Sequence, residues 1–148
     1  MRKIKDIVTK PSEALEAMIR GALKQSERPD FVIDMITFGG SRGNICYGCM
    51  ATCAIQEVAG ENLSPGDITD ETYRAEALGF EFYDLCQFEE AIDKARQGMP
   101  SYLFQYYDIP FSNIDYSELA HFDLQNDNWR EQLPKVQQFI DQIKAMGY

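Results

Sequence analysis

The feature that most constrains this chain is the stretch from Gly39 to Gly60, which holds three of the four cysteines. It opens with a glycine-rich loop, after which Asn44 is a suitable helix N-cap because its side chain can accept a free backbone N–H of the first turn. Gly60 suits the left-handed position just past a helix end. The run between them, Ile45–Ala59, is apolar on most sides, which is typical of a buried helix. We therefore predict a helix over Ile45–Ala59 at the centre of the fold.

The clustered cysteines admit several roles. At about 100° per residue, Cys46, Cys49 and Cys53 share one helical face, and free cysteine commonly packs as a small buried hydrophobe. A metal site is an alternative, with Cys86 or His121 as a further ligand. However, a regular helix separates Cys46 from Cys53 by roughly 10 Å, too far for both to form Zn–S bonds of about 2.3 Å to one ion. A metal site would then use only Cys46, Cys49, Cys86 and His121. We expect packing and no cofactor, and keep the four cysteines and His121 as metal-ligand candidates.

Thiol–disulfide chemistry is another alternative, because Cys46-Tyr47-Gly48-Cys49 is a C-x-x-C motif at a predicted helix N-terminus. The helix dipole there lowers a thiol pKa and favours the attacking thiolate. If Lys3–Val8 and Phe31–Phe38 were strands, the order would be strand, helix, strand, C-x-x-C helix. That order resembles the start of a thioredoxin-like fold over the first third of the chain. The resemblance implies an α/β fold and an oxidoreductase that uses both cysteines of the motif.

His121 is the only histidine of the chain, and histidine is the commonest general acid–base residue. With Cys46 or Cys53 it would form a nucleophile–base pair. No sequence pattern brings these side chains together. Cys46, Cys49 and His121 therefore stand only as catalytic candidates, and we favour a protein that is not an enzyme.

Charge is distributed unevenly along the 148 residues. Residues 1–45 carry eight basic and six acidic side chains, whereas residues 46–148 carry six and 18, so the respective net charges are +2 and −12. Nucleic-acid binding needs a basic face and is not expected, whereas an acidic surface attracts basic proteins. No apolar run is long enough for a membrane span, and the N-terminus lacks the apolar core of a signal peptide. With four cysteines, these features predict a cytoplasmic protein with reduced thiols.

Helical periodicity predicts a mainly α fold. Apolar residues of the segment that begins at Pro11 recur at i, i+3, i+4 and i+7, the spacing of an amphipathic helix. Capping and stop signals delimit the others. Phe31–Phe38 is ambiguous between strand and helix, and its polar spacing favours helix. The predicted helices are Pro11–Ser26, Phe31–Phe38, Ile45–Ala59, Asp70–Leu78, Asp84–Gln97, Ser101–Tyr107 and Leu133–Met146. We expect residues 1–148 to form one domain, a bundle of about five to seven helices around Ile45–Ala59.

The segment Met99–Phe122 is rich in aromatic residues, which usually fill a core, with tyrosine at its margin. Tyrosine is also enriched at the binding hot spots of protein interfaces. A second interpretation is therefore an acidic, aromatic-bearing interaction surface. Its candidate residues are Tyr102, Tyr106, Tyr107, Tyr116, Glu89, Glu90 and Asp93.

The function we favour from sequence is a non-enzymatic protein-interaction module, of an inhibitor or immunity type, for a basic partner. A thiol–disulfide oxidoreductase and a Cys/His metal-binding protein are the alternatives. The sequence leaves the oligomeric state open.

Overall fold

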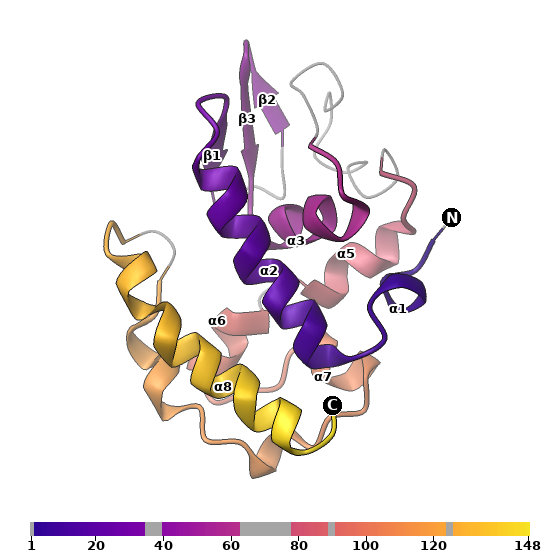
Figure 1. Ribbon diagram of the computed structural model, residues 1–148, viewed down its shortest axis with the longest axis vertical. Helices are drawn as coiled ribbons and strands as arrows, with labels where there is room; N and C mark the ends of the chain where they lie inside the picture. The colour runs from indigo at the N-terminus through magenta and orange to yellow at the C-terminus, as the bar shows by residue number, and fades with distance from the viewer. Residues whose placement is uncertain (1, 35–39, 63–77, 89–90, 124–125) are drawn as a thin grey trace.

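The chain is mainly helical, as predicted (Figure 1). The computed structural model describes residues 2–34, 40–62, 78–88, 91–123 and 126–148. Its α-helices are α1 (Ile4–Ile7), α2 (Pro11–Ser26), α3 (Met50–Ala59), α5 (Phe82–Phe88), α6 (Ala91–Arg96), α7 (Tyr102–Tyr106) and α8 (Leu133–Ala145). Its strands are β1 (Phe31–Ile33), β2 (Gly40–Arg42) and β3 (Ile45–Gly48), and 3-10 turns are η2 (Phe111–Asn113), η3 (Ser117–His121) and η4 (Trp129–Gln132).

The two longest of the described helices confirm the predictions made from periodicity. Helix α2 begins at Pro11, whose fixed φ and missing N–H suit the first turn. Helix α8 begins at Leu133, with Pro134 in its first turn after the 3-10 turn η4. Each helix buries one apolar stripe: Ala14, Leu15, Met18 and Ala22 in α2, and Val136, Phe139, Ile140 and Ile143 in α8. Helix α2 packs against both α3 and α8.

The predicted central helix over Ile45–Ala59 is wrong in its first turn. Ile45–Gly48 is strand β3, Cys49 is the N-cap, and helix α3 begins only at Met50. Strand pairing on both sides gives the backbone of β3 its hydrogen bonds, which outweighs a local tendency toward helix. The far end agrees with the prediction, because Gly60 adopts the left-handed conformation, at φ 72°, that ends α3.

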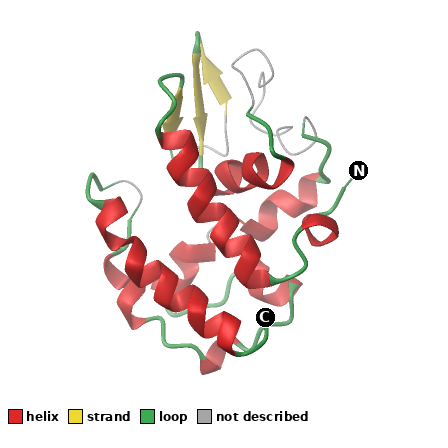
Figure 2. Ribbon diagram, viewed as in Figure 1, coloured by secondary structure: helices red, strands yellow, loops and turns green. Residues whose placement is uncertain are grey.

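The three strands form one small sheet in the order β1-β3-β2, seen in yellow beyond the end of α2 (Figure 2). Strands β1 and β3 are parallel, with Phe31 opposite Cys46, and β2 is antiparallel to β3. The helix predicted over Phe31–Phe38 is therefore wrong for Phe31–Ile33, while residues 35–39 lie outside the described ranges. Phe31 is buried and Val32 is 46% exposed, the alternation of a half-covered strand.

The remaining predicted helices are confirmed in part. Asp84–Gln97 corresponds to α5 and α6, with residues 89–90 outside the described ranges. Ser101–Tyr107 corresponds to α7, with Ser101 as its N-cap. Asp70–Leu78 lies outside the described residues, except for Leu78. The aromatic residues Phe104, Phe111 and Phe122 are buried, as expected for a core segment.

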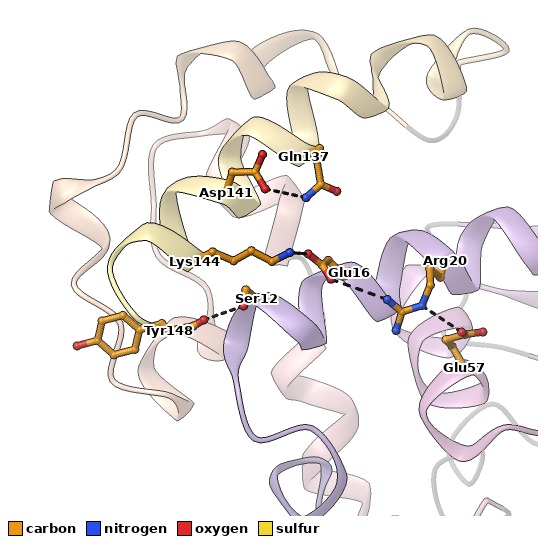
Figure 3. A network of polar contacts seen from close by, with 8 residues as sticks. All are labelled: Ser12, Glu16, Arg20, Glu57, Gln137, Asp141, Lys144 and Tyr148. Atoms are coloured by element: carbon orange, nitrogen blue, oxygen red, sulfur yellow. Dashed lines mark hydrogen bonds and ion pairs between the residues drawn. The ribbon is translucent and has the colours of Figure 1, made fainter.

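A line of charged residues joins α8, α2 and α3 on the surface (Figure 3). Glu16 of α2 pairs with Lys144 of α8 and, at 4.0 Å, with Arg20 one turn along α2. Arg20 in turn reaches Glu57 of α3 at 3.3 Å. Such exposed pairs contribute little to stability, so the apolar contacts beneath them hold the three helices together.

Candidate functional site

The cysteines predicted to pack in the interior do so. Cys46 in β3, Cys49 at the N-cap of α3 and Cys53 one turn later are buried and free of disulfides. The Cys49 thiol lies 3.8 Å from the hydroxyl of Thr52, which is also buried. Cys86 in α5 is half-buried. Three of the four sulfurs are thus part of the core between α2, α3 and the sheet.

The structure does not arrange the C-x-x-C motif as the thioredoxin-like alternative requires. The first strand of that alternative, Lys3–Val8, is wrong because Ile4–Ile7 forms helix α1. Cys46 lies inside a strand rather than in the first turn of a helix, and it has no solvent exposure. An attacking thiolate must reach an external disulfide, and this position does not offer that access.

The metal-ligand candidates are distributed over different parts of the fold. His121 ends η3, which packs against α6 and α8, whereas the clustered cysteines belong to β3 and α3. The His121 side chain is outside the described part. Among the side chains that the structure describes, no three Cys, His, Asp or Glu gather closely enough to hold an ion.

The predicted interaction-surface residues occupy separate places. Tyr102 is 63% exposed on α7, whereas Tyr106 and Tyr107 at the end of that helix are half-buried. Tyr116 stacks on the ring of Phe111, with centroids 5.1 Å apart. Asp93 pairs with Arg96 within α6 at 3.1 Å. Glu89 and Glu90 lie outside the described residues.

Tyr106 and Tyr107 belong to a polar cluster where α1, α5 and α7 meet. Its centre is Asp84, in the first turn of α5, which is only 2% exposed. One oxygen of Asp84 accepts the backbone N–H of Ile4 at 2.7 Å, and the other accepts the hydroxyl of Tyr106 at 3.1 Å. The hydroxyl of Tyr107 donates to the backbone oxygen of Val8 at 2.8 Å. We call this group of residues the tyrosine–aspartate cluster.

Burial perturbs the acids of the tyrosine–aspartate cluster. Loss of hydration raises the pKa of Asp84 above the ordinary 3.8, although its hydrogen bonds with Ile4 and Tyr106 act in the opposite direction. Burial, and next the negative charge of Asp84, raise the pKa of Tyr106 to about 12. Burial also raises the pKa of Tyr107. The cluster therefore combines an aromatic wall with carboxylate charge in a partly dehydrated place, which is the chemistry of cation recognition.

Sequence reasoning missed two residues here. Asp84 was predicted only as the first residue of a helix, because its partner Ile4 lies 80 positions away. Tyr83, which is 77% exposed on α5, was not singled out. A buried carboxylate leaves no trace in local periodicity.

The N-terminal segment is held against the chain just before α5. The backbone N–H of Arg2 donates to Gly79 at 2.7 Å, and the N–H of Glu81 donates back to Arg2 at 3.0 Å. The guanidinium group of Arg2 bonds the backbone oxygen of Leu78 and lies 4.5 Å from the ring centroid of Phe80. These contacts, with those of Ile4 and Val8, fix α1 beside α5 and α7.

In the parts of the chain that are described, no helix has both the length and the apolar character needed to cross a bilayer. Comparison with known protein families, with curated proteins and with solved structures finds no significant match in any of the three.

Proposed function

We propose that this protein is a non-enzymatic interaction module, of an inhibitor or immunity type, which presents the tyrosines of α5 and α7 to a basic protein. The observation that carries the proposal is the exposure of Tyr83 and Tyr102, which are 77% and 63% accessible. Large aromatic side chains left in solvent at this level are typical of binding hot spots, where tyrosine is enriched.

The two exposed rings come from a firmly joined pair of helices. Helix α5 packs against α7. Tyr106, one turn after Tyr102, donates to Asp84, which directly follows Tyr83. Because this hydrogen bond fixes one helix against the other, little backbone ordering remains to oppose association.

Charge supports a basic partner. Residues 46–148, which include α5 and α7, carry a net charge of −12. A negative field of this kind steers a positively charged protein toward the tyrosines and raises its association rate, more strongly at low ionic strength.

The burial of Cys46 and Cys49 favours this proposal over a thiol–disulfide oxidoreductase. A cytoplasmic location belongs to the same proposal, because free thiols suit a reducing compartment.

Site-specific photocrosslinking tests the proposal directly. A photoreactive phenylalanine is placed at Tyr83 or Tyr102 and, as the matched control, at the exposed Val32 of β1. We expect the first two positions to crosslink one basic protein in cells that make this chain, and the control to miss it. Capture of that protein should weaken as salt is raised. Equal crosslinking from Val32, or an acidic partner, would contradict the proposal.

A further inference from the structure

We propose that Tyr106 and Tyr107 form an alkylammonium-binding corner, which in this structure is occupied by the chain's own Lys5. The Lys5 ammonium nitrogen lies 4.1 Å from the ring centroid of Tyr106 and 5.3 Å from that of Tyr107. The two rings stand at 89° with their centroids 5.3 Å apart, so they make two walls of a corner. Aromatic walls of this kind recognise lysine and quaternary ammonium groups.

Negative charge surrounds the corner. Asp84 holds the hydroxyl of Tyr106, while the charges of Asp6 and Glu13 act on Tyr106 and Tyr107 respectively. An ammonium group placed between the rings is therefore attracted by both the aromatic faces and the nearby carboxylates. A neutral apolar group of the same shape would gain only contact area.

Lys5 behaves as a replaceable occupant. Its side chain is exposed, so it reaches the rings from the solvent side. The backbone of α1 is held by contacts that do not involve the Lys5 side chain: Asp84 accepts the N–H of Ile4, and Tyr107 donates to the backbone oxygen of Val8. The Lys5 side chain can thus leave the corner while these backbone contacts persist, and an ammonium group from outside can take its place.

The natural ligand we infer is a lysine side chain of the basic partner, an identification that rests on the proposed function. The corner lies close to the exposed Tyr102, because Tyr106 follows Tyr102 by one helical turn. Lys5 then acts as a resident competitor. It lowers the apparent affinity of the corner by the fraction of molecules in which it occupies the site.

Titration with Nα-acetyl-lysine amide tests the corner without any partner, with Nα-acetyl-norleucine amide as the uncharged control ligand. Binding is followed by NMR through the ring signals of Tyr106 and Tyr107. Removing the occupant with Lys5→Ala should tighten lysine binding by about fivefold, the ratio that corresponds to one exposed cation–π contact. Lys24→Ala, which removes the same charge from an exposed site on α2, should leave the affinity unchanged.

Three further variants test whether the corner itself binds the ligand. In the Lys5→Ala background, Tyr106→Phe keeps the ring and should retain binding, whereas Tyr106→Leu should lose it. Lys5→Gln keeps most of the aliphatic stem and should behave as Lys5→Ala does. If Tyr106→Leu does not fold, the NMR titration of Lys5→Ala still tests the site. Chemical-shift changes confined to tyrosines other than Tyr106 and Tyr107 would overturn the proposal. Equal binding by wild type and Lys5→Ala, or equal binding of the norleucine ligand, would also overturn it. Failure to find a crosslinked partner would leave these results unchanged, so the two proposals fail separately.

Discussion

Gly21 of α2 lies directly against the backbone carbonyl group of Cys53 in α3. A β-carbon built on Gly21 would stand 2.6 Å from the Cys53 carbonyl carbon, closer than real β-carbons approach other atoms. Only glycine therefore allows α2 and α3 to pack at this distance. Helix α2 therefore contacts the buried turn of α3 at Cys53 and also packs against α8.

Gly21→Ala should destabilise the fold strongly, because the obstructing atoms are backbone and cannot rotate away. We expect a loss of about 2–4 kcal/mol in the free energy of unfolding, measured by urea denaturation. Gly43→Ala is the matched control, since its β-carbon would meet nothing within 4 Å. Its positive φ of 60° should cost only about 1–2 kcal/mol. A Gly21→Ala loss no greater than the control would show that α2 and α3 can separate freely.

Asp84→Asn should destabilise the protein in a pH-dependent way. The raised pKa means that folded Asp84 holds its proton over a range in which the unfolded chain has lost it. Its contribution is therefore fully present below the ordinary pKa of 3.8 and is lost as pH rises through the folded pKa. The stability difference between wild type and Asp84→Asn, about 1–3 kcal/mol for the disturbed hydrogen bonds, should be largest in acid and shrink toward neutral pH.

Asp115 provides a control of opposite sign for that experiment. Hydrogen bonds from Ser117 hold the pKa of Asp115 below its usual value. The stability that Asp115 contributes is therefore present above the unfolded pKa and is lost as pH falls. The difference between wild type and Asp115→Asn should shrink in acid. Parallel pH profiles for the two variants would contradict the assignment of a raised pKa to Asp84.

Tyr106 should ionise only in strong alkali, at a pKa of about 12. The ultraviolet absorbance of tyrosinate follows the titration, and the difference from Tyr106→Phe identifies the step. Asp84→Asn should bring the pKa of Tyr106 down, because it removes the negative charge beside the hydroxyl. The pKa should stay above the ordinary 10.0, since burial is the larger cause. If the Tyr106 titration is unchanged in Asp84→Asn, the charge of Asp84 does not contribute to the raised pKa of Tyr106.

Thiol reagents should distinguish Cys86 from the other cysteines. In the native protein we expect one fast reaction, at the half-buried Cys86, and slow reaction of the buried Cys46, Cys49 and Cys53. Their reaction requires the core to open. All four thiols should react at once in denaturant. Cys86→Ala should abolish the fast phase, and a fast phase that persists in this variant would reveal an accessible thiol in the C-x-x-C motif.

Local sequence signals were sufficient for the helices whose start and buried face are both encoded within one segment. In α2, Pro11 and the apolar stripe that includes Leu15 and Met18 define both the start and the buried face. In α8 the stripe of Val136, Ile140 and Ile143 does the same. These signals lie within one element, so no knowledge of distant partners is needed.

The strands could not be predicted in this way, because pairing partners are set by the whole fold. Strand β3 is parallel to β1, which ends at Ile33. No local sequence pattern predicts that pairing. One available signal was missed. Gly43-Asn44 is a two-residue connection between strands in which Arg42 pairs with Ile45, and Gly43 has the positive φ that such hairpins need. The capping tendency of Asn44 had favoured a helix start at this point instead.

The candidate site was only partly predictable for the same reason. Tyrosine enrichment pointed correctly to the sequence of α7, where Tyr102 is exposed. It did not separate Tyr102 from Tyr106 and Tyr107, whose burial depends on α1. The charge partner Asp84 and the occupant Lys5 come from segments far apart in sequence, so only the folded chain brings them together.

The hydrogen bond between Ile4 and Asp84 also has a consequence for synthesis on the ribosome. Its partners are separated by 80 residues, so α1 emerges long before Asp84, whose carboxylate accepts the N–H of Ile4. At about 5–20 residues per second, α1 waits roughly 4 to 16 s for α5. A helix of four residues does not persist alone for that time. Ile4 and Val8 therefore gain their hydrogen bonds with Asp84 and Tyr107 only after α5 and α7 have been synthesised, so α1 takes its final position late in translation.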